Sequence, residues 1–374
     1  MKITGIVTEY NPFHQGHIHH ITLTRRITGC DVLIAVMSGN FVQRGEPAVI
    51  DKWQRTEAAL THGVDLVIEL PFAYAVQSAK QFAEASIGIL ALAGVTDIVF
   101  GSETNNLEEL KEFAAMPINV NAFKEKMKSG AGYPAAYGLS TASYFPNDIL
   151  GIAYLKAMEG TGITPHTIQR TNSYHDTAMD PVFASASALR HAHFNQLPLN
   201  GQTPLESALA TYPTTDWQAY YPALRLKLLT TDKETLSRLF LFDEGIENHL
   251  VKQAMDSDTW EIFLNRAVTR RYTKARIQRS CTHALVHTRK EEINGLSKYP
   301  YLRVLGFNQI GREYLKHLQT NEVKIASRFN QIPEAIRKLE LRSTLAYASV
   351  LPPELRNQLV KREIQGPIVI EKKD

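Results

Sequence analysis

Short apolar segments alternate with amphipathic ones along the first 200 residues. Four near-continuous apolar runs of strand length lie at residues 3–8, 31–39, 65–71 and 96–103. Segments with helical spacing lie between them, at residues 17–28, 52–63 and 78–94. Strands that are buried on both faces lose the polar alternation of a half-exposed strand, and their regular alternation with helices is typical of parallel sheets. The pattern predicts an α/β fold, a doubly wound parallel sheet with helices on both faces.

The pattern changes twice further along the chain. Residues 105–145 interrupt the alternation and are interpreted as an insertion, with a basic helical segment at 122–130. The alternation then resumes with a helix at 146–158, a strand at 163–170, a loop at 172–177 and a helix from 185. From about residue 202 the patterns are mostly helical, without clean strand alternation. We therefore predict one domain over residues 1–200 and a mostly helical region over 201–374, divided near residues 197–207.

Composition narrows the classes of protein to which the chain can belong. With 374 residues, 44% of them hydrophobic, it can bury a sizeable core. No apolar run approaches the roughly 20 residues of a membrane span, and the first residues lack the apolar region of a secretory signal. Cys30 and Cys281 are too few and too far apart for a disulfide framework or a zinc site. We expect a cytoplasmic protein without membrane association, and nothing in the sequence indicates a protein partner.

Four histidines and a glycine lie close together near the start of the chain, in the stretch EYNPFHQGHIHH. The stretch connects the first predicted strand to the first predicted helix, so it belongs at the carboxyl edge of the sheet, where open α/β sheets bind ligands. His14 and His17 are three residues apart, and Gly16 would let a phosphate approach free N–H groups at the helix start. A metal cluster is the alternative, but zinc usually takes ligands from more than one segment. We predict a phosphate site without metal-ligating residues, in which at least one of His19 and His20 has a packing or solvent role.

Residues 262–289 contain seven Lys or Arg residues and no Asp or Glu, although the net charge of the whole chain is only +3. A run of charge is most often a solvated face. This run also contains Tyr272 and two histidines, which fits contact with a phosphate backbone and an exposed base. We interpret it as a polynucleotide-binding strip, with residues 122–130 and 301–316 as weaker candidates. Its candidate RNA-contacting residues are Arg270, Arg271, Lys274, Arg276 and Arg279.

The segment FHQGH has the H-x-G-H form of the nucleotidyltransferase superfamily, which includes the class I aminoacyl-tRNA synthetases. Together with MSGNFVQRGEPAVIDKWQRTEAAL, DLVIELPF, FGSE, PNDILGIAYLKA and SASALR, it resembles the bacterial tRNA(Met) cytidine acetate ligase family. The resemblance covers the whole predicted α/β half and continues into RRYTKARIQR. It implies a HUP-like nucleotidyltransferase domain that binds ATP over residues 1–200 and a tRNA-binding region over 201–374.

The resemblance also implies the residues of the ATP site. His14 and His17 are the expected catalytic pair. ATP is expected to contact Val7, Thr8, Glu9, Tyr10, Asn11, Pro12, Phe13, His14, Gln15, Gly16, His17, Ile18, His19, His20, Gly101, Asn147 and Arg170.

The three isolated positions each have a physical reason, and two of them have an alternative role. Gly101 lacks a side chain at the end of the fourth strand, which could leave room for adenine or ribose. Asn147 starts a helix, where an ordinary N-cap is the alternative. Arg170 ends a strand and could reach phosphates, unless it is a surface arginine.

The segment SASALR resembles the second phosphate signature of the superfamily. Ser185 and Ser187 could cap a helix or hold phosphate oxygens, and Arg190 could neutralise the pyrophosphate leaving group. The chain lacks the K-M-S-K-S form of this signature that is found in many synthetases. Arg44 and Gly45, which follow the second strand, either order over the substrate or form a simple turn.

The implied reaction is the ATP-dependent acetylation of one tRNA base. Acetate has a poor leaving group and the exocyclic amine of cytosine is a weak nucleophile, so adenylation by ATP, with release of pyrophosphate, would activate the acyl group. Attack of the amine on the acetyl-adenylate gives N4-acetylcytidine at the wobble position of elongator tRNA(Met), where the base can be unstacked. ATP and Mg²⁺ are the expected cofactors. A nucleotidyltransferase acting on a small phosphorylated metabolite and a non-catalytic RNA-binding protein are the alternatives.

Overall fold

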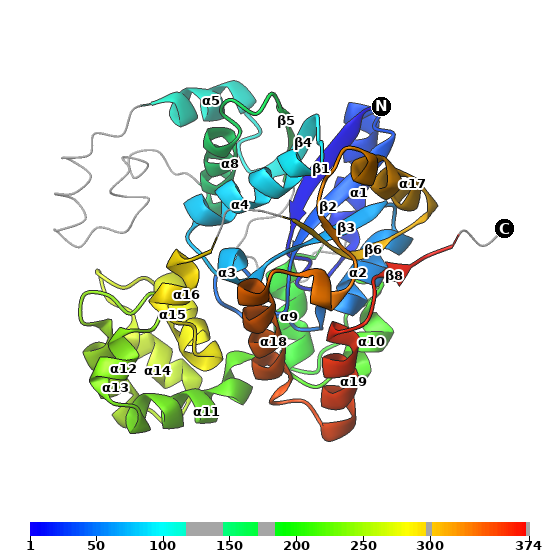
Figure 1. Cartoon of the computed structure of the whole chain (residues 1–374). Helices are drawn as coiled ribbons and strands as arrows, with labels where there is room; N and C mark the ends of the chain where they lie inside the picture. The colour runs from blue at the N-terminus through cyan, green and yellow to red at the C-terminus, as the bar shows by residue number, and fades with distance from the viewer. Residues whose placement is uncertain (117–144, 171–183, 297–300, 372–374) are drawn as a thin grey trace.

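The computed structural model describes residues 1–116, 145–170, 184–296 and 301–371. In these ranges one mixed sheet contains the strands β1 (Ile3–Thr8), β2 (Val32–Ser38), β3 (Leu66–Leu70), β4 (Asp97–Ser102), β5 (Thr164–Gln169), β6 (Leu302–Phe307), β7 (Ile325–Ala326) and β8 (Ile368–Val369). Their order is β5-β4-β1-β2-β3-β6-β7, and β8 pairs with β6 (Figure 1). The first five strands run parallel, so their carboxyl ends lie along one edge. This confirms the predicted parallel sheet.

Helices cover both faces of the sheet, as predicted. One face carries α1 (Gln15–Thr28) and α2 (Lys52–Thr61), and the other carries α4 (Ala79–Leu92), α8 (Pro146–Ala157) and α17 (Gln309–Thr320). Alternate residues of β2 divide between two apolar clusters, because successive side chains of a strand point to opposite faces. Leu33 and Ala35 pack with α1 and α2, whereas Ile34 and Val36 pack with the helices of the other face.

The helix ends follow local signals in the sequence. Asp51 caps α2: its carboxylate accepts the N–H groups of Trp53 (2.9 Å) and Gln54 (3.2 Å). Gly29 ends α1 in the left-handed conformation, with φ of 61°, which glycine adopts without a Cβ clash. These caps explain why the strand–helix boundaries of the first 100 residues could be predicted.

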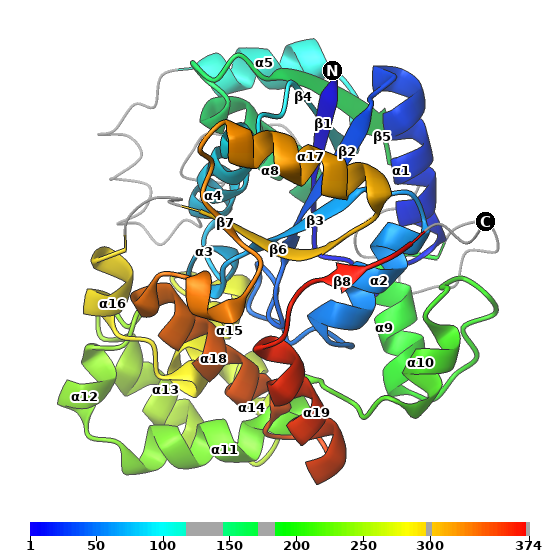
Figure 2. The same cartoon turned by 45° about the vertical axis from the view of Figure 1, so that its right-hand side comes forward.

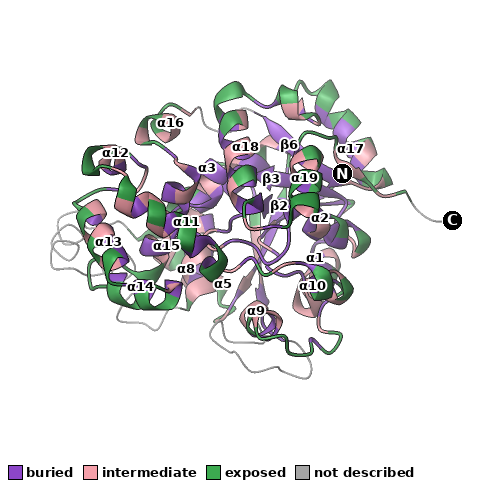
Figure 3. Ribbon diagram, turned by 90° about the horizontal axis from the view of Figure 1, so that it is seen from below, coloured by how far each residue is buried: buried purple, intermediate pink, exposed green. Residues whose placement is uncertain are grey.

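The remaining helices are α3 (Phe72–Ala75), α5 (Leu107–Ala115), α9 (Ala186–Phe194), α10 (Glu206–Thr211), α11 (Trp217–Thr230), α12 (Lys233–Ser237), α13 (Ile246–Met255), α14 (Trp260–Ala267), α15 (Lys274–Val286), α16 (Lys290–Asn294), α18 (Glu334–Ala348) and α19 (Pro353–Glu363). Figures 1 and 2 show α11 to α16 gathered on one side of the sheet. Their apolar side chains continue the cluster beneath α1 and α2. In Figure 3 the strands β2 and β3 are buried, whereas exposed residues gather on the outer turns of α14 and α19. None of the helices in the described ranges is long and apolar enough to cross a membrane.

The sequence predicted no strand after residue 202, and this is wrong for the segments that form β6, β7 and β8. β6 pairs antiparallel with β3, with Phe307 opposite Leu66, so the parallel sheet continues into a mixed one. The weaker RNA-binding candidate at 301–316 is therefore a core strand followed by α17. Arg303, one of the three basic residues of the segment, is 4% exposed, whereas Arg312 is half-buried and Lys316 is exposed. The strand was missed because tertiary partners neutralise Arg303 inside the core, where an isolated sequence gives no sign of them.

Part of the predicted insertion lies outside the described residues. The basic segment at 122–130 and the loop at 172–177 fall in the ranges that the structure leaves out. The described beginning of the insertion forms α5, which packs against α8. The predicted helix and strand that follow the insertion are confirmed as α8 and β5.

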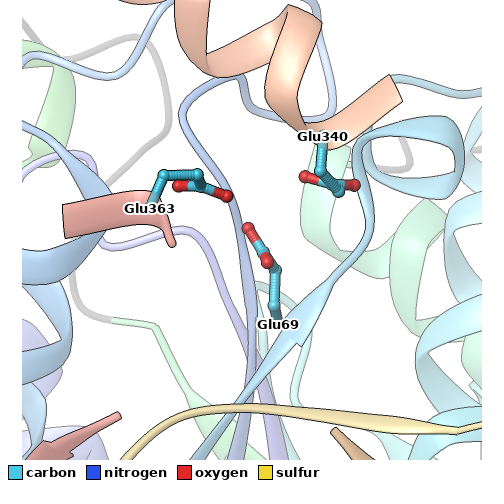
Figure 4. Close-up of side chains that lie close together, drawn as sticks. All are labelled: Glu69, Glu340 and Glu363. Atoms are coloured by element: carbon cyan, nitrogen blue, oxygen red, sulfur yellow. The ribbon is translucent and has the colours of Figure 1, made fainter. Parts of the chain in front are cut away.

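Five charged side chains are buried where the C-terminal segments meet the sheet: Lys52, Glu69, Arg303, Glu340 and Glu363. Lys52 Nζ lies 2.6 Å from Glu69 Oε1 and 2.9 Å from Glu363 Oε1. Arg303 Nη2 lies 2.7 Å from Glu363 Oε1, and Arg303 Nη1 contacts Glu69 Oε2. Figure 4 shows the three carboxylates converging from β3, α18 and α19. This buried network therefore connects the last two helices to the sheet.

Three carboxylates share only two cations in this network, so one negative charge has no matching cation among the five side chains when all three carboxyls are ionised. Glu340 is the least paired: its Oε2 lies 3.9 Å from Arg303 Nη1, whereas Glu69 and Glu363 each contact both cations. Burial raises the pKa of Glu340 to about 8. Although burial opposes it, the charges of Arg303 and Lys52 lower the pKa of Glu363 to about 2. Glu340 is therefore the protonated carboxyl at neutral pH.

Candidate active site

The H-x-G-H loop leaves β1 at the carboxyl edge of the sheet. The side chains of Glu9 and Asn11 accept backbone N–H groups from the loop after β2, at 2.8 and 2.9 Å. Burial raises the pKa of Glu9. Tyr10 has a left-handed φ of 50°, and its buried ring lies 4.8 Å from the ring of His17, centroid to centroid. The loop is thus fixed from its first residue, and Tyr10 supports the second histidine of the motif.

His14 is the N-cap of α1 rather than a residue of its first turn. Nδ1 of His14 accepts the N–H of Gly16 (3.0 Å), and Nδ1 of His17 accepts the N–H of His14 (3.2 Å). The ring centroids of the two histidines are 3.8 Å apart. A neutral imidazole that accepts at Nδ1 carries its proton on Nε2. Each histidine therefore has an Nε2–H donor on the ring atom that the cap does not use.

Both imidazoles are neutral. Burial lowers the pKa of His14 to about 3, and the charges of Arg170 and Arg190 lower it in the same direction. Burial, together with His14, His20 and Arg170, lowers the pKa of His17 well below its usual range. The rings are nevertheless only half-buried. They can donate hydrogen bonds to phosphate oxygens, and the structure brings both predicted arginines near them.

The first turn of α1 does not offer the free N–H groups that the sequence predicted. Gln15 N donates to Gln202 O (3.0 Å), Gly16 N to His14 Nδ1, and His17 N to His14 O (2.8 Å). A Cβ at Gly16 would lie 2.8 Å from Cε1 of His14. Glycine is needed here because the His14 ring occupies the space predicted for a phosphate. Side chains, rather than backbone N–H groups, are the donors of this loop.

The segment predicted as a domain boundary, near residues 197–207, packs against the motif. Gln15 Nε2 donates to Gly201 O (3.2 Å), and Thr203 Oγ1 donates to Phe13 O (2.6 Å). Sequence reasoning missed this contact because the segment has only turn residues and no chemical motif. It fixes the outer side of the H-x-G-H loop.

Helix α9 brings the SASALR segment to the same loop. Ser185 is the N-cap of α9 and accepts a first-turn N–H (3.0 Å), which is the capping role predicted for it. Arg190 donates through Nη1 to Asn11 O (2.8 Å) and through Nη2 to Ser187 Oγ (3.2 Å). Arg190 Nη2 also lies 3.7 Å from Glu46 Oε2. The guanidinium group of Arg190 is therefore held beside the motif, where an anionic ligand could contact it.

Gly101 and Arg170 form one unit at the ends of β4 and β5. A Cβ at Gly101 would lie 3.1 Å from Cγ of Arg170, so the aliphatic part of the arginine fills the space predicted for adenine or ribose. Arg170 N donates to Ser102 O (2.9 Å), which continues the pairing of β5 with β4. The charge of Arg170 acts on His14 and His20. A residue without a side chain is therefore needed at position 101, because the side chain of Arg170 lies against it on its way toward the motif.

Asn147 lies in the first turn of α8, which has Phe145 as its N-cap, so Asn147 is not the cap. Asn147 Nδ2 donates to Glu103 Oε1 (2.5 Å), and Glu103 Oε2 accepts the N–H of Asp148 (3.1 Å). Buried Asp148 accepts the hydroxyl of Ser102. Sequence reasoning missed Glu103 and Asp148, although both lie in the quoted segments FGSE and PNDILGIAYLKA. These acids position Asn147 at the end of β4.

The loop after β2 is a turn packed against α15. Gly45 N donates to Val42 O (2.8 Å), and Gly45 has a φ of 81°. Of the two interpretations of Arg44 and Gly45, the structure therefore has the simple turn. A Cβ at Gly45 would lie 2.6 Å from Arg279 N in α15. Gly45 O accepts Trp217 Nε1 (3.0 Å) and Thr282 Oγ1 (2.7 Å). The helical region therefore contacts the loop that holds Glu9 and Asn11.

The basic strip, residues 262–289, runs from α14 to just beyond α15, and its five candidate RNA-contacting residues lie on α15 and the loop before it. Arg271 Nη2 is 3.1 Å from Glu244 Oε2, and Arg276 Nη2 is 3.5 Å from Asp243 Oδ2. Acids are absent from residues 262–289 along the sequence, but the loop between α12 and α13 supplies them in space. Two of the five predicted RNA-contacting residues are thus ion-paired.

Only part of the strip faces solvent. Tyr272 is 7% exposed and His283 is 0% exposed, so neither can stack on a base, contrary to the prediction, whereas the second histidine, His287, is half-buried. Arg279 is half-buried, and burial with two neighbouring guanidinium groups lowers its pKa to about 10. Arg270 and Lys274 are exposed. These two residues remain the strip's candidates for direct phosphate contact.

Among the described residues, Glu69, Glu340 and Glu363 are the one group of three potential ligands close enough to share a metal ion. The nitrogen atoms of Lys52 and Arg303 already lie among these carboxylates. Cations of the protein itself satisfy the group, and it is buried in the core. It is therefore an ion-pair network rather than a metal site.

Comparison with known proteins agrees with this geometry. The chain matches the HIGH Nucleotidyl Transferase family over residues 1–363. The tRNA(Met) cytidine acetate ligase of Geobacillus sp. (strain WCH70) is 37% identical over 99% of this chain and 100% of the relative. The ligase of Bacillus subtilis (strain 168) is 34% identical over 97% of this chain and 96% of the relative.

Two crystal structures of Thermotoga maritima TmcAL have the same fold. The apo form I matches with a TM-score of 0.90 at 29% identity, and the form bound with alpha-thio ATP matches with a TM-score of 0.86 at 30% identity. Each match covers 100% of both chains. The similarity therefore extends from the motif loop through the helical region, and this chain belongs to the tRNA(Met) cytidine acetate ligase family of the HIGH nucleotidyltransferases.

Proposed function

We propose that this chain is an ATP-dependent ligase that activates acetate as acetyl-adenylate and transfers the acetyl group to N4 of the wobble cytidine of elongator tRNA(Met). The observation that carries the proposal is the pair of neutral Nε2–H imidazoles, His14 and His17, near Arg170 and Arg190 at the carboxyl edge of the sheet. Full-length relatives named as tRNA(Met) cytidine acetate ligases support it, as does a TmcAL structure bound with alpha-thio ATP.

In the first step, a carboxylate oxygen of acetate attacks the α-phosphorus of ATP. The bond between that phosphorus and the bridging oxygen breaks, and pyrophosphate leaves. Negative charge grows on the phosphate oxygens, where fixed neutral donors such as His14 and His17 stabilise the transition state without reorganisation. Arg190, which donates to Asn11 O, would bind the departing pyrophosphate and neutralise part of its charge. In the second step, the cytidine amine attacks the acetyl carbon, AMP leaves, and the amine loses a proton.

We propose that Mg²⁺ enters as the magnesium complex of ATP, held by phosphate oxygens. Among the described residues, the carboxylates that lie close enough together to bind an ion are buried beside Lys52 and Arg303, which already pair with them. The proposal therefore uses none of these three carboxylates as a metal ligand. The magnesium ion would neutralise phosphate charge and orient the triphosphate.

We propose that the two halves of the chain divide the substrates. Residues 1–200 would hold ATP and acetate, and residues 201–374 would hold tRNA, with their last strands completing the sheet. The close approach of Gly45 to α15 supports this division, because it joins the loop beside the motif to the helix that carries the basic strip.

The two alternatives fit the molecule less well. A nucleotidyltransferase for a small metabolite would not need the six helices from α11 to α16 with exposed Arg270 and Lys274. A non-catalytic RNA-binding protein would not need the reciprocal cap that keeps both imidazoles neutral and fixes their protons on Nε2.

Labelled acetate tests the proposed reaction directly. Incubation of the protein with isotopically labelled acetate, ATP, Mg²⁺ and unmodified elongator tRNA(Met) is expected to label a single cytidine. AMP and pyrophosphate should form in a one-to-one ratio with acetylcytidine, because adenylation cleaves ATP at the α-phosphorus. Mass spectrometry of the digested tRNA and chromatography of the nucleotides measure both products.

Two outcomes would contradict this reaction. Efficient transfer from acetyl-CoA without ATP would show a different acyl donor. Formation of ADP in place of AMP would move the attack to the γ-phosphorus and leave His14 and His17 without the proposed role. A tRNA whose wobble cytidine is replaced by uridine is the matched control and should stay unlabelled.

Reversing the two exposed charges of the strip should weaken tRNA binding. In the double variant Arg270→Glu and Lys274→Glu, the slope of log affinity against log salt should fall by about 1.5, roughly the counterions released at two single-strand phosphate contacts. Filter binding at several salt concentrations measures the slope. The variant Lys80→Glu and Lys361→Glu, which changes two exposed lysines elsewhere, has the same net charge and should keep the wild-type slope. If the two double variants show the same slope of log affinity against log salt, the strip is a solvated face that does not contact tRNA.

A further inference from the structure

Arg55 is a fully buried arginine beneath the motif loop, and the two steps above do not use it. Its side chain is 0% exposed. It lies in α2 three residues after Lys52 and four before Ala59, which are also buried, so one internal face of this helix carries two cations. A buried cation is costly and needs a physical reason.

The guanidinium group of Arg55 donates to backbone carbonyl oxygens of three segments. Nη1 donates to Glu9 O (2.6 Å), which follows β1, and to Ser38 O (3.2 Å), which ends β2. Nη2 donates to Gly39 O, and Nε donates to Ile50 O (3.1 Å). A single planar group thus connects the carboxyl ends of two central strands with the entry to α2.

The carboxylates of Asp51 and Glu9 act on this charge without forming an ion pair with it. Within the part of the chain that the structure describes, the close partners of Arg55 are carbonyl oxygens, and it forms no ion pair. Burial lowers the pKa of Arg55, but an arginine with an ordinary pKa above about 12 stays charged at neutral pH. A buried cation whose counter-charges, Asp51 and Glu9, do not contact it destabilises the protein, and an anionic ligand bound nearby would offset that cost.

The place of Arg55 points to such a ligand. Glu9, whose carbonyl it holds, begins the H-x-G-H loop, and the side chain of Glu9 accepts the N–H of Gln43 from the loop after β2. Arg55 also holds Gly39, at the start of that second loop. Both loops that surround the motif are therefore attached to one cation. The histidines at the end of the first loop are the groups argued above to contact phosphate oxygens.

We propose that Arg55 is a positioning residue for acetate activation, which fixes both loops at the carboxyl edge and supplies a buried positive charge for the phosphates of ATP. The reaction part of this proposal rests on the proposed function, whereas the binding part needs only ATP. Loss of the charge should weaken ligands in order of their negative charge. Loss of the planar set of N–H donors, with the charge kept, should displace the two loops and lower kcat.

Three variants separate the two effects. Arg55→Met removes the charge and the donors, and Arg55→Lys keeps the charge but loses the planar fork. Arg25→Lys is the matched control: Arg25 Nη2 also donates to a carbonyl, Gly63 O (2.8 Å), but it pairs with Asp65 (2.6 Å) before the start of β3. Calorimetry gives the Kd of adenosine, AMP, ADP and ATP, and acetate-dependent ATP–pyrophosphate exchange gives kcat and KM. Melting temperatures establish that each variant is folded.

In Arg55→Met, ATP should bind about tenfold more weakly, as expected for the loss of one charge near the phosphates at an intermediate dielectric. Adenosine should bind as in wild type, with AMP and ADP between. In Arg55→Lys, KM for ATP should stay close to wild type while kcat falls about tenfold or more, because lysine cannot hold the carbonyls of both loops at once. Arg25→Lys should change neither the nucleotide series nor kcat.

Equal weakening of all four nucleosides and nucleotides in Arg55→Met would overturn the proposal, since the arginine would then only support the fold. An Arg55→Lys protein with unchanged kcat, or with a KM for ATP raised as far as that of Arg55→Met, would overturn it too. If Arg55→Met does not fold, the KM and kcat of Arg55→Lys decide alone. A wild-type protein that binds ATP but shows no acetate-dependent exchange would instead contradict the proposed function, and the nucleotide series would still test the charge of Arg55.

Discussion

Replacing His17 with asparagine is expected to slow acetate-dependent ATP–pyrophosphate exchange by at least about 10²-fold, roughly what one transition-state donor contributes. Asparagine is chosen because its Oδ1 can still accept the N–H of His14, as Nδ1 of His17 does at 3.2 Å. The variant therefore keeps the cap of α1 and loses the Nε2–H donor. An alanine variant would lose both, so its effect would not distinguish catalysis from folding.

Two further variants make this expectation specific. His17→Gln places an amide N–H near the position of Nε2 and should retain more activity than His17→Asn. His191→Asn changes an exposed histidine of α9 and should exchange at the wild-type rate. Exchange rates are measured with labelled pyrophosphate on proteins of equal melting temperature. A folded His17→Asn protein with near wild-type exchange would remove His17 from the mechanism.

Replacing Lys52 with methionine is expected to lower the free energy of unfolding by about 3–5 kcal/mol, the usual cost of removing one partner from a buried ion pair. Lys52 contacts Glu69 at 2.6 Å and Glu363 at 2.9 Å, and without it three buried carboxylates share Arg303. Urea denaturation measures the loss. Lys80→Met, at a lysine whose side chain is 60% exposed, should change stability by no more than about 0.5 kcal/mol. Equal stability of Lys52→Met and wild type would show that the network does not hold the C-terminal helices.

The same network predicts a pH dependence of stability through Glu340. Burial raises its pKa to about 8 in the folded chain, so the folded state keeps a proton that the unfolded state releases at its ordinary pKa of about 4.5. The stabilisation is full below the unfolded pKa, falls as pH rises, and is lost above about 8. Between pH 5 and 8 this carboxyl should lower the free energy of unfolding by up to about 1.4 kcal/mol for each unit that the pH rises. Glu340→Gln mimics the protonated form and should remove this slope, and an unchanged slope would assign the proton to another group.

The first half of the fold could be predicted because its signals are local. Continuous apolar runs identified β1 to β4, and Asp51 and Gly29 marked helix ends through bonds to their own neighbours. β6 could not be predicted, because Arg303 interrupts an otherwise apolar run. Only the carboxylates of Glu69 and Glu363, far away in the sequence, make that arginine compatible with the core.

The candidate site divides in the same way. The motif predicted that His14 and His17 lie together, and the ring centroids are 3.8 Å apart. It did not predict that both Nδ1 atoms cap α1, because both the cap and the choice of proton position depend on backbone geometry. The basic strip looked free of acids until folding brought Asp243 and Glu244 to it.

The sequence by itself determined the order of strands and helices in the first half, the position of the H-x-G-H loop at the carboxyl edge, and the family. Those properties depend on hydrophobic periodicity and on residues that are neighbours along the chain. Only the tertiary structure decided which charges are free, which are paired and which donors face a ligand. Burial and long-range partners set the protonation of the histidines and of Glu340 and the pairing of Arg271 and Arg276. They also left Arg55 charged among carbonyl oxygens, because desolvation and Coulomb energies depend on distance in space rather than along the sequence.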